Sequence, residues 1–167
     1  MTHLYELYQK DYTAWAEKTA ELLKSGQFAE LDIEHLLEEL ASMGASECNE
    51  LESRLTILIA HLLKWQFQYQ HLSDKWKEFD GRSWRSTIIE QRTRIVKRLR
   101  KSPGLKANLS EILIEAYQDA LELAIKETQL PAATFPSQCP YTVEQLLNDD
   151  FYPRQNEHVG TICTNMF

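Results

Sequence analysis

The chain has 167 residues and a formal net charge of −7, with 43% hydrophobic and 26% charged residues. This length fits one domain, and the composition excludes a wholly disordered chain. The sequence has no run of the ~20 apolar residues that a membrane-spanning helix needs. Its first residues, MTHLYELYQKD, lack the basic and apolar pattern of a secretory signal. We therefore expect a cytoplasmic protein.

The cysteines are Cys48, Cys139 and Cys163. Their number is odd, and no two of them have the C-x-x-C spacing of a zinc or redox motif. The pattern argues against a disulfide framework and against a cysteine zinc site. We expect reduced thiols and no cofactor.

Apolar residues recur with a helical period in the first third of the chain. One predicted helix covers residues 11–25 and ends at Gly26. The next begins at Asp32, a good N-cap, and ends at Gly44. Its apolar face is formed by Ile33, Leu36, Leu37 and Leu40.

The rest of the chain predicts further helices near residues 46–70, 83–102 and 105–130. Three prolines indicate an extended segment over residues 131–141. Thr142 and Gln145 then form a capping-box pattern for a short helix.

These elements predict an all-α fold: a single-domain bundle of about five main helices plus a short C-terminal helix. The predicted helical domain covers residues 1–153. Residues 154–167 are polar and are expected to form a flexible tail.

The helix predicted over residues 83–102 is basic. Residues 82–106 contain nine basic side chains and one acidic side chain, whereas residues 1–52 contain three basic and twelve acidic ones. A basic block can bind nucleic acid or phosphate. The charges surround this helix, however, so we favour neutralisation by Glu34, Glu38 and Glu39 of the helix that begins at Asp32.

One candidate catalytic pair is Arg54 and His61, which lie seven residues apart on one helical face. An arginine and a histidine could bind a phosphate and transfer a proton. The spacing is similar to the R-x4-6-H motif of the HEPN ribonuclease superfamily, whose members are small helical proteins that cleave RNA as dimers. The alternative is structural, with His61 hydrogen-bonded at the edge of the core and Arg54 paired with Glu50.

A candidate metal site has less support. The residues concerned are Asp32, Glu34, His35, Glu38 and Glu39, in which His35 and the two later glutamates have helical ligand spacing. The helical wheel points Glu34, His35 and Glu38 to solvent, and no second helix offers matching ligands. We therefore predict no metal.

Aromatic residues are concentrated between Trp65 and Trp84. Aromatic side chains between basic residues can stack on nucleic-acid bases. At these spacings they more often pack a helix end against its loop, and we favour packing.

Several phrases occur together in order: LDIEHLLEEL, ELESRL, HLLKWQFQ, GRSWRSTIIEQR and CPYTVEQLLNDDFYP. Over about residues 5–153 the chain thereby resembles the family called "domain of unknown function 29", which is abundant in cyanobacteria. The resemblance implies an all-helical single domain and no assigned activity. The positions that match are Glu38, Glu39, Arg54, His61, Lys64, Trp65, Trp84, Arg85, Gln91 and Arg92.

If the second, third and fourth predicted helices pack side by side, some of these positions would form one polar cluster. Its candidate binding residues are Glu38, Trp65, Arg85 and Arg92, next to the catalytic candidates Arg54 and His61. The cluster could equally be a buried network that fixes the bundle.

Without a strong catalytic motif, the favoured interpretation is a non-enzymatic cytoplasmic helical module that binds a protein partner or a second copy of itself. The alternative is an RNA-acting protein that uses Arg54 and His61.

Overall fold

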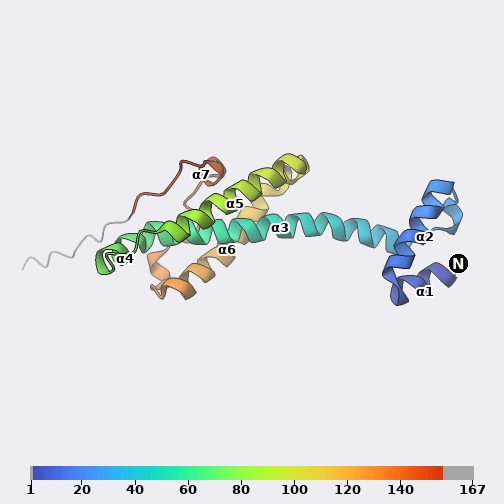
Figure 1. The fold of residues 1–167 in the computed structure, drawn as a ribbon, viewed down its shortest axis with the longest axis horizontal. Helices are drawn as coiled ribbons and strands as arrows, with labels where there is room; N and C mark the ends of the chain where they lie inside the picture. Colours follow the sequence, from blue (N-terminus) through green and yellow to red (C-terminus); the bar gives the residue numbers. More distant parts are fainter. Residues whose placement is uncertain (1, 156–167) are drawn as a thin grey trace, which may run out of the picture. The chain divides into compact units, whose positions relative to one another are not determined.

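The computed structural model describes residues 2–155, which form helices and loops and contain no strand. The all-α prediction is confirmed. The chain divides into two compact units, Met1–Glu47 and Cys48–Phe167. Figure 1 shows the elements in chain order.

The first unit contains α1 (Thr2–Lys10), α2 (Tyr12–Ser25), the short 3-10 helix Phe28–Glu30 and the start of α3 (Ile33–Phe67). The Asp11 carboxylate caps α2 by accepting a hydrogen bond from the Ala14 N–H at 3.0 Å. Gly26 ends α2 in the left-handed region at φ 72°. The limits of α2 therefore match the sequence prediction, whereas α1 was not predicted.

Aromatic and acidic side chains hold α1 and α2 to the start of α3. The Tyr8 ring stacks on the His35 ring with centroids 3.9 Å apart. Glu39 accepts hydrogen bonds from the hydroxyl groups of Tyr8 and Tyr12 at 2.6 and 2.7 Å. The bond from Tyr8 is the main reason that the pKa of Glu39 lies below its usual value. The small core of this unit is therefore largely polar and aromatic.

His35 is buried, which corrects the prediction that it points to solvent. Its Nδ1 lies 2.6 Å from Oδ2 of Asp32. The wheel prediction is correct for Glu34 and Glu38, which are exposed, and wrong for His35. It assumed that the face bearing Ile33 packs, whereas the packed face bears His35 and Glu39.

The helix that begins at Ile33 continues through Gly44 to Phe67. The sequence prediction of two helices separated at Gly44 is therefore wrong. The condition on which the polar cluster depended, that these two helices pack side by side, is not met. A glycine lowers helix stability but does not end a helix unless the chain after it turns away. Helical residues continue on both sides of Gly44 without interruption.

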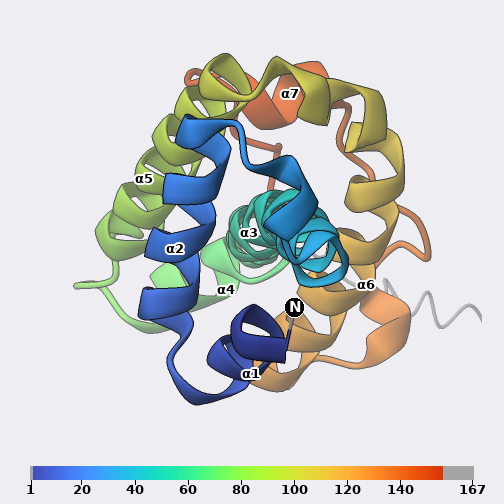
Figure 2. The same ribbon diagram turned by 90° about the vertical axis from the view of Figure 1, so that its right-hand side faces the viewer.

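The second unit is a bundle around the later part of α3. It adds α4 (Tyr69–Lys75), α5 (Arg82–Lys101), the 3-10 helix Pro103–Asn108, α6 (Leu109–Thr128), the 3-10 helix Ala132–Thr134 and α7 (Val143–Leu147). Figures 1 and 2 show α3 between α5 and α6, and α7 covers a further side of the bundle in Figure 2. The α3 side chains Leu51, Leu55, Leu58, Ile59, Leu62 and Leu63 are fully buried in the core.

The segment after α6 wraps around the bundle. Phe135 and Tyr141 are buried. Both hydrogen bonds of the predicted capping box between Thr142 and Gln145 are present. The expected helix near residues 46–70 ends earlier, at Phe67, and Gln68 is the N-cap position of the separate helix α4. The predicted tail lies outside the described residues from residue 156 onward.

Within residues 2–155, no helix combines the length and the apolar character that crossing a bilayer requires.

Gly44→Ala distinguishes a continuous helix from a break. A Cβ at Gly44 would meet no atom within 4 Å. We expect the substitution to raise the unfolding free energy by about 0.5–1 kcal/mol, as in a helix interior. Urea unfolding followed by far-ultraviolet circular dichroism measures this change.

The matched control is Gly26→Ala, which also has open space around the new Cβ but places alanine at φ 72°. We expect it to destabilise by about 1 kcal/mol. Destabilisation by both variants would contradict a helix that continues through Gly44.

Candidate functional site

Three of the predicted binding residues meet at one tyrosine. The guanidinium carbons of Arg85 and Arg92 lie 5.3 and 5.5 Å from the ring centroid of Tyr152. The Trp65 ring centroid lies 4.9 Å from that of Tyr152. The expected cluster thus includes Trp65, Arg85 and Arg92, and its organising residue is one that the sequence analysis did not select.

Arg92 is fully buried and binds backbone carbonyl groups. Its Nε donates to the oxygen of Leu146 at 2.9 Å, and its Nη1 donates to that of Asp149 at 3.4 Å. Its Nη2 donates to the oxygens of Gln145 and Phe151 at 3.3 and 2.7 Å. Burial lowers the pKa of Arg92 from the usual arginine value, with smaller opposing effects of Tyr152 and Asp149. Its donors are therefore used to hold the end of α7 and the following segment.

Arg85 differs from Arg92 because its side chain is exposed. Trp65 stacks on Tyr69 with ring centroids 4.6 Å apart. Further ring contacts join Tyr69 to Phe79 and Phe79 to Trp84. The aromatic residues between Trp65 and Trp84 therefore pack the end of α3 against the loop before α5, as the packing interpretation expected.

Arg54 is held by neighbouring side chains. Its guanidinium lies 2.9 Å from Glu50, one helical turn earlier, and its Nη1 donates to Oε1 of Gln91 at 3.4 Å. Glu50 also lies 3.8 Å from Arg98 of α5. Arg54 therefore joins α3 to α5.

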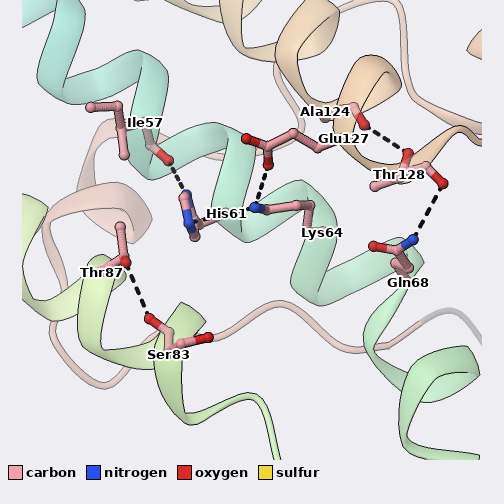
Figure 3. A network of polar contacts seen from close by, with 9 residues as sticks. All are labelled: Ile57, His61, Lys64, Gln68, Ser83, Thr87, Ala124, Glu127 and Thr128. Atoms are coloured by element: carbon pink, nitrogen blue, oxygen red, sulfur yellow. Dashed lines mark hydrogen bonds and ion pairs between the residues drawn. The ribbon is translucent and has the colours of Figure 1, made fainter. Parts of the chain in front are cut away.

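His61 belongs to a different network, which Figure 3 shows. Its Nδ1–H donates to the carbonyl oxygen of Ile57 at 2.8 Å. Its Nε2 is 3.5 Å from the ammonium of Lys64, which also pairs with Glu127 of α6. That ammonium lies 5.2 Å from the ring centroid of Trp84 in α5. The network therefore joins three helices through the buried Lys64.

The pKa of His61 lies below the ordinary histidine value of 6.5, first because the ring is buried and then because of the Lys64 charge. A neutral ring satisfies both contacts, with Nδ1 as donor and Nε2 as acceptor. Among residues 2–155, no hydrogen bond joins Arg54 to His61. Their catalytic role stays a prediction, and each has a structural partner of its own.

Glu38 lies in the first unit, where its side chain is exposed. The same unit contains the candidate metal ligands. No group of three or more histidine, cysteine, aspartate and glutamate side chains in the described part of the chain is arranged to hold a metal ion.

The basic helix α5 has acidic partners other than the predicted ones. Ion pairs join Arg82 to Asp80 at 2.9 Å, Arg94 to Glu90 at 2.9 Å and Arg98 to Glu50 at 3.8 Å. Glu39, expected as a partner of α5, instead accepts bonds from Tyr8 and Tyr12. Neutralisation is therefore partial and local.

The sequence analysis missed Tyr152 and the roles of Lys64 and Glu127. Lys64 had a detectable signal, because it is a cation in the apolar run ILIAHLLKW. A lysine within such a run needs a partner when the helix is buried. Nothing near Glu127 or Tyr152 identified them as partners.

Arg92→Met tests the role of the buried guanidinium. It leaves several backbone carbonyls without donors, and we expect the unfolding free energy to fall by about 3 kcal/mol. The control is Arg85→Met, which removes the exposed guanidinium that lies over the Tyr152 ring. We expect it to lower the unfolding free energy by less than about 1 kcal/mol. Urea unfolding measures both, and equal losses would contradict this role.

His61→Gln tests the neutral histidine. Because the folded pKa is lowered, the unfolded chain binds more protons between the two pKa values, so stability falls as pH drops below 6.5. The variant should lose this part of the pH dependence. Unfolding midpoints between about pH 5 and 8 measure it, and identical slopes for both proteins would contradict the assignment.

Comparison with known proteins places the chain in a family. No curated protein and no solved structure matches it. The family model described as "Domain of unknown function DUF29" matches residues 7–152, and it spans Arg92, its carbonyl partners and Tyr152. The chain therefore belongs to the DUF29 family.

Proposed function

We propose that the chain is a non-enzymatic cytoplasmic interaction module that binds a protein partner through the first unit. The observation that carries this proposal is a row of exposed apolar side chains on α3, here named the apolar stripe: Ile33, Leu37, Leu40 and Met43. Their exposed fractions are 50%, 61%, 58% and 64%.

The spacing of the apolar stripe argues for one continuous surface. Residues three or four positions apart are neighbours on a helix face. Single exposed leucines are common, but a contiguous exposed apolar patch is typical of an interaction site. An amphipathic helix commonly binds its partner by laying such a face in an apolar groove.

Acidic residues suggest the chemistry of the partner. Glu34 precedes Leu37 by three residues and Glu38 follows Glu34 by four, so both carboxylates lie along one side of the stripe. Both are exposed, and within residues 2–155 neither forms an ion pair. The fitting partner surface is therefore apolar with basic residues beside it.

The second unit agrees with a non-enzymatic role. Arg54 and His61 are held by structural partners. The cysteines Cys48 and Cys139 are free thiols, as is usual in a reducing compartment.

A labelled helical peptide built from leucine and lysine tests the proposal by fluorescence anisotropy. We expect the full chain to bind this peptide and the Leu37→Gln/Leu40→Gln variant to bind it at least about tenfold more weakly. A tenfold change in affinity corresponds to a smaller free energy than the burial of one leucine side chain provides, and the variant loses two. All substituted side chains are exposed, so the fold should be unchanged.

The matched control is Ile89→Gln/Ile114→Gln, which replaces two exposed apolar side chains of the second unit. It should bind the peptide like the unaltered chain. A control that binds as weakly as the Leu37→Gln/Leu40→Gln variant, or an unaltered chain that does not bind, would refute the proposal.

A further inference from the structure

A hollow in the second unit complements the apolar stripe. It has a volume of about 290 Å³ and is lined by Val96, Leu99, Arg100, Lys106 and Leu147. These residues come from α5, the 3-10 helix Pro103–Asn108 and α7. We name it the α5–α7 groove. Its three apolar side chains can contact apolar side chains of a docked helix, and its two cations provide a basic edge.

The cations of this groove lack acidic partners. Arg100 and Lys106 are exposed, and neither forms an ion pair in the part of the chain that the structure describes. Lys97 and Lys101 of α5 are also exposed and unpaired among these residues. An unpaired basic edge favours an acidic partner over a neutral one, through Coulomb attraction at close range.

The first unit has the opposite charge. Residues 1–47 contain ten acidic and three basic side chains, whereas residues 82–106 contain nine basic and one acidic. The apolar stripe has Glu34 and Glu38 along its side, and the α5–α7 groove has Arg100 and Lys106 at its edge. Each copy of the chain thus carries both an apolar acidic helix face and an apolar basic groove.

We infer that the partner of the apolar stripe is a second copy of this chain, which receives the stripe in its α5–α7 groove. This inference rests on the proposed function, because it names the occupant for the same stripe. The buried leucines supply the main attraction, and the pairs between Glu34 or Glu38 and Arg100 or Lys106 favour this arrangement over others.

Pairing of one stripe with another stripe is opposed by charge. It would bring Glu34 and Glu38 of both copies close together, and like charges on two docked surfaces repel. Stripe and groove are different surfaces, so the contact is heterologous. Reciprocal exchange between two copies closes a dimer, whereas one-way exchange extends to larger assemblies.

Sedimentation of the full chain at several concentrations tests the inference. The unaltered chain should self-associate, and the association should weaken as salt rises. The charge-reversed stripe variant Glu34→Lys/Glu38→Lys and the groove variant Arg100→Glu/Lys106→Glu should each associate at least about tenfold more weakly. The control Lys75→Glu/Lys77→Glu makes the same net charge change as the groove variant, and it should associate like the unaltered chain.

The decisive measurement mixes the two weakened variants in equal amounts. Association should return, because one copy supplies an unaltered groove and the other supplies an unaltered stripe. The reversed stripe and the reversed groove also match in sign. Stripe-to-stripe pairing predicts a different result for the groove variant alone, which would then associate like the unaltered chain because its stripe is unchanged.

Three outcomes would overturn the inference: a monomeric unaltered chain, self-association that survives both variants, or a mixture that stays dissociated. A monomeric chain that still binds the leucine and lysine peptide through the apolar stripe would leave the proposed function standing and direct attention to another protein. A chain that neither self-associates nor binds the peptide would refute both.

Discussion

The second unit depends on a buried positive charge whose hydrogen bonds go to backbone carbonyl groups. A guanidinium carries five N–H donors in a planar fork, and Arg92 uses three of its nitrogens to reach four backbone carbonyls. Those of Gln145 and Leu146 lie in α7, near its C-terminal end, where carbonyl groups carry partial negative charge. The guanidinium therefore supplies donors to carbonyls at this helix end, and that of Gln145 also accepts from the Asn148 N–H. A lysine has one nitrogen and could not serve all four positions.

A second polar network, around Lys64, holds three longer helices together. Lys64 of α3 pairs with Glu127 of α6, lies over Trp84 of α5 and borders Nε2 of His61. Because His61 is neutral, the ammonium has a neighbouring acceptor instead of a second cation. His61, which the sequence analysis selected as a catalytic candidate, therefore helps to position these helices. The same arrangement explains why the R-x6-H spacing in this chain accompanies structural contacts.

Local chemistry made several elements predictable. The cap at Asp11, the left-handed Gly26 and the capping box at Thr142 depend on residues within a few positions of one another. The period of apolar residues also predicted a helix near residues 46–70, which corresponds to the later part of α3. Such signals are complete within one turn or one helix, so a single sequence contains them.

The remaining features depend on distant parts of the chain. Gly44 has the residue type of a helix end, but its neighbours continue the helix. The apolar period at Ile33, Leu37 and Leu40 was correct, yet it could not tell whether another surface of the same chain covers that face. The pairing of Trp65, Arg85 and Arg92 was expected, whereas their meeting point, Tyr152, lies more than fifty residues beyond them. The period of apolar residues describes one helix. It does not identify the distant segment of the chain that packs against that helix.

The order of synthesis gives the Arg92 contacts a further meaning. The ribosome makes α5 well before it makes the carbonyl groups that Arg92 binds, which lie between Gln145 and Phe151. Until those residues emerge, burial of the guanidinium would leave a charge without acceptors, which is costly. The helices α3, α5 and α6 can pack against one another earlier. The Arg92 side chain becomes fully hydrogen-bonded only after residues 145–151 have been made. A chain that stops short of Phe151 would thus keep Arg92 hydrated, whereas the complete bundle buries it.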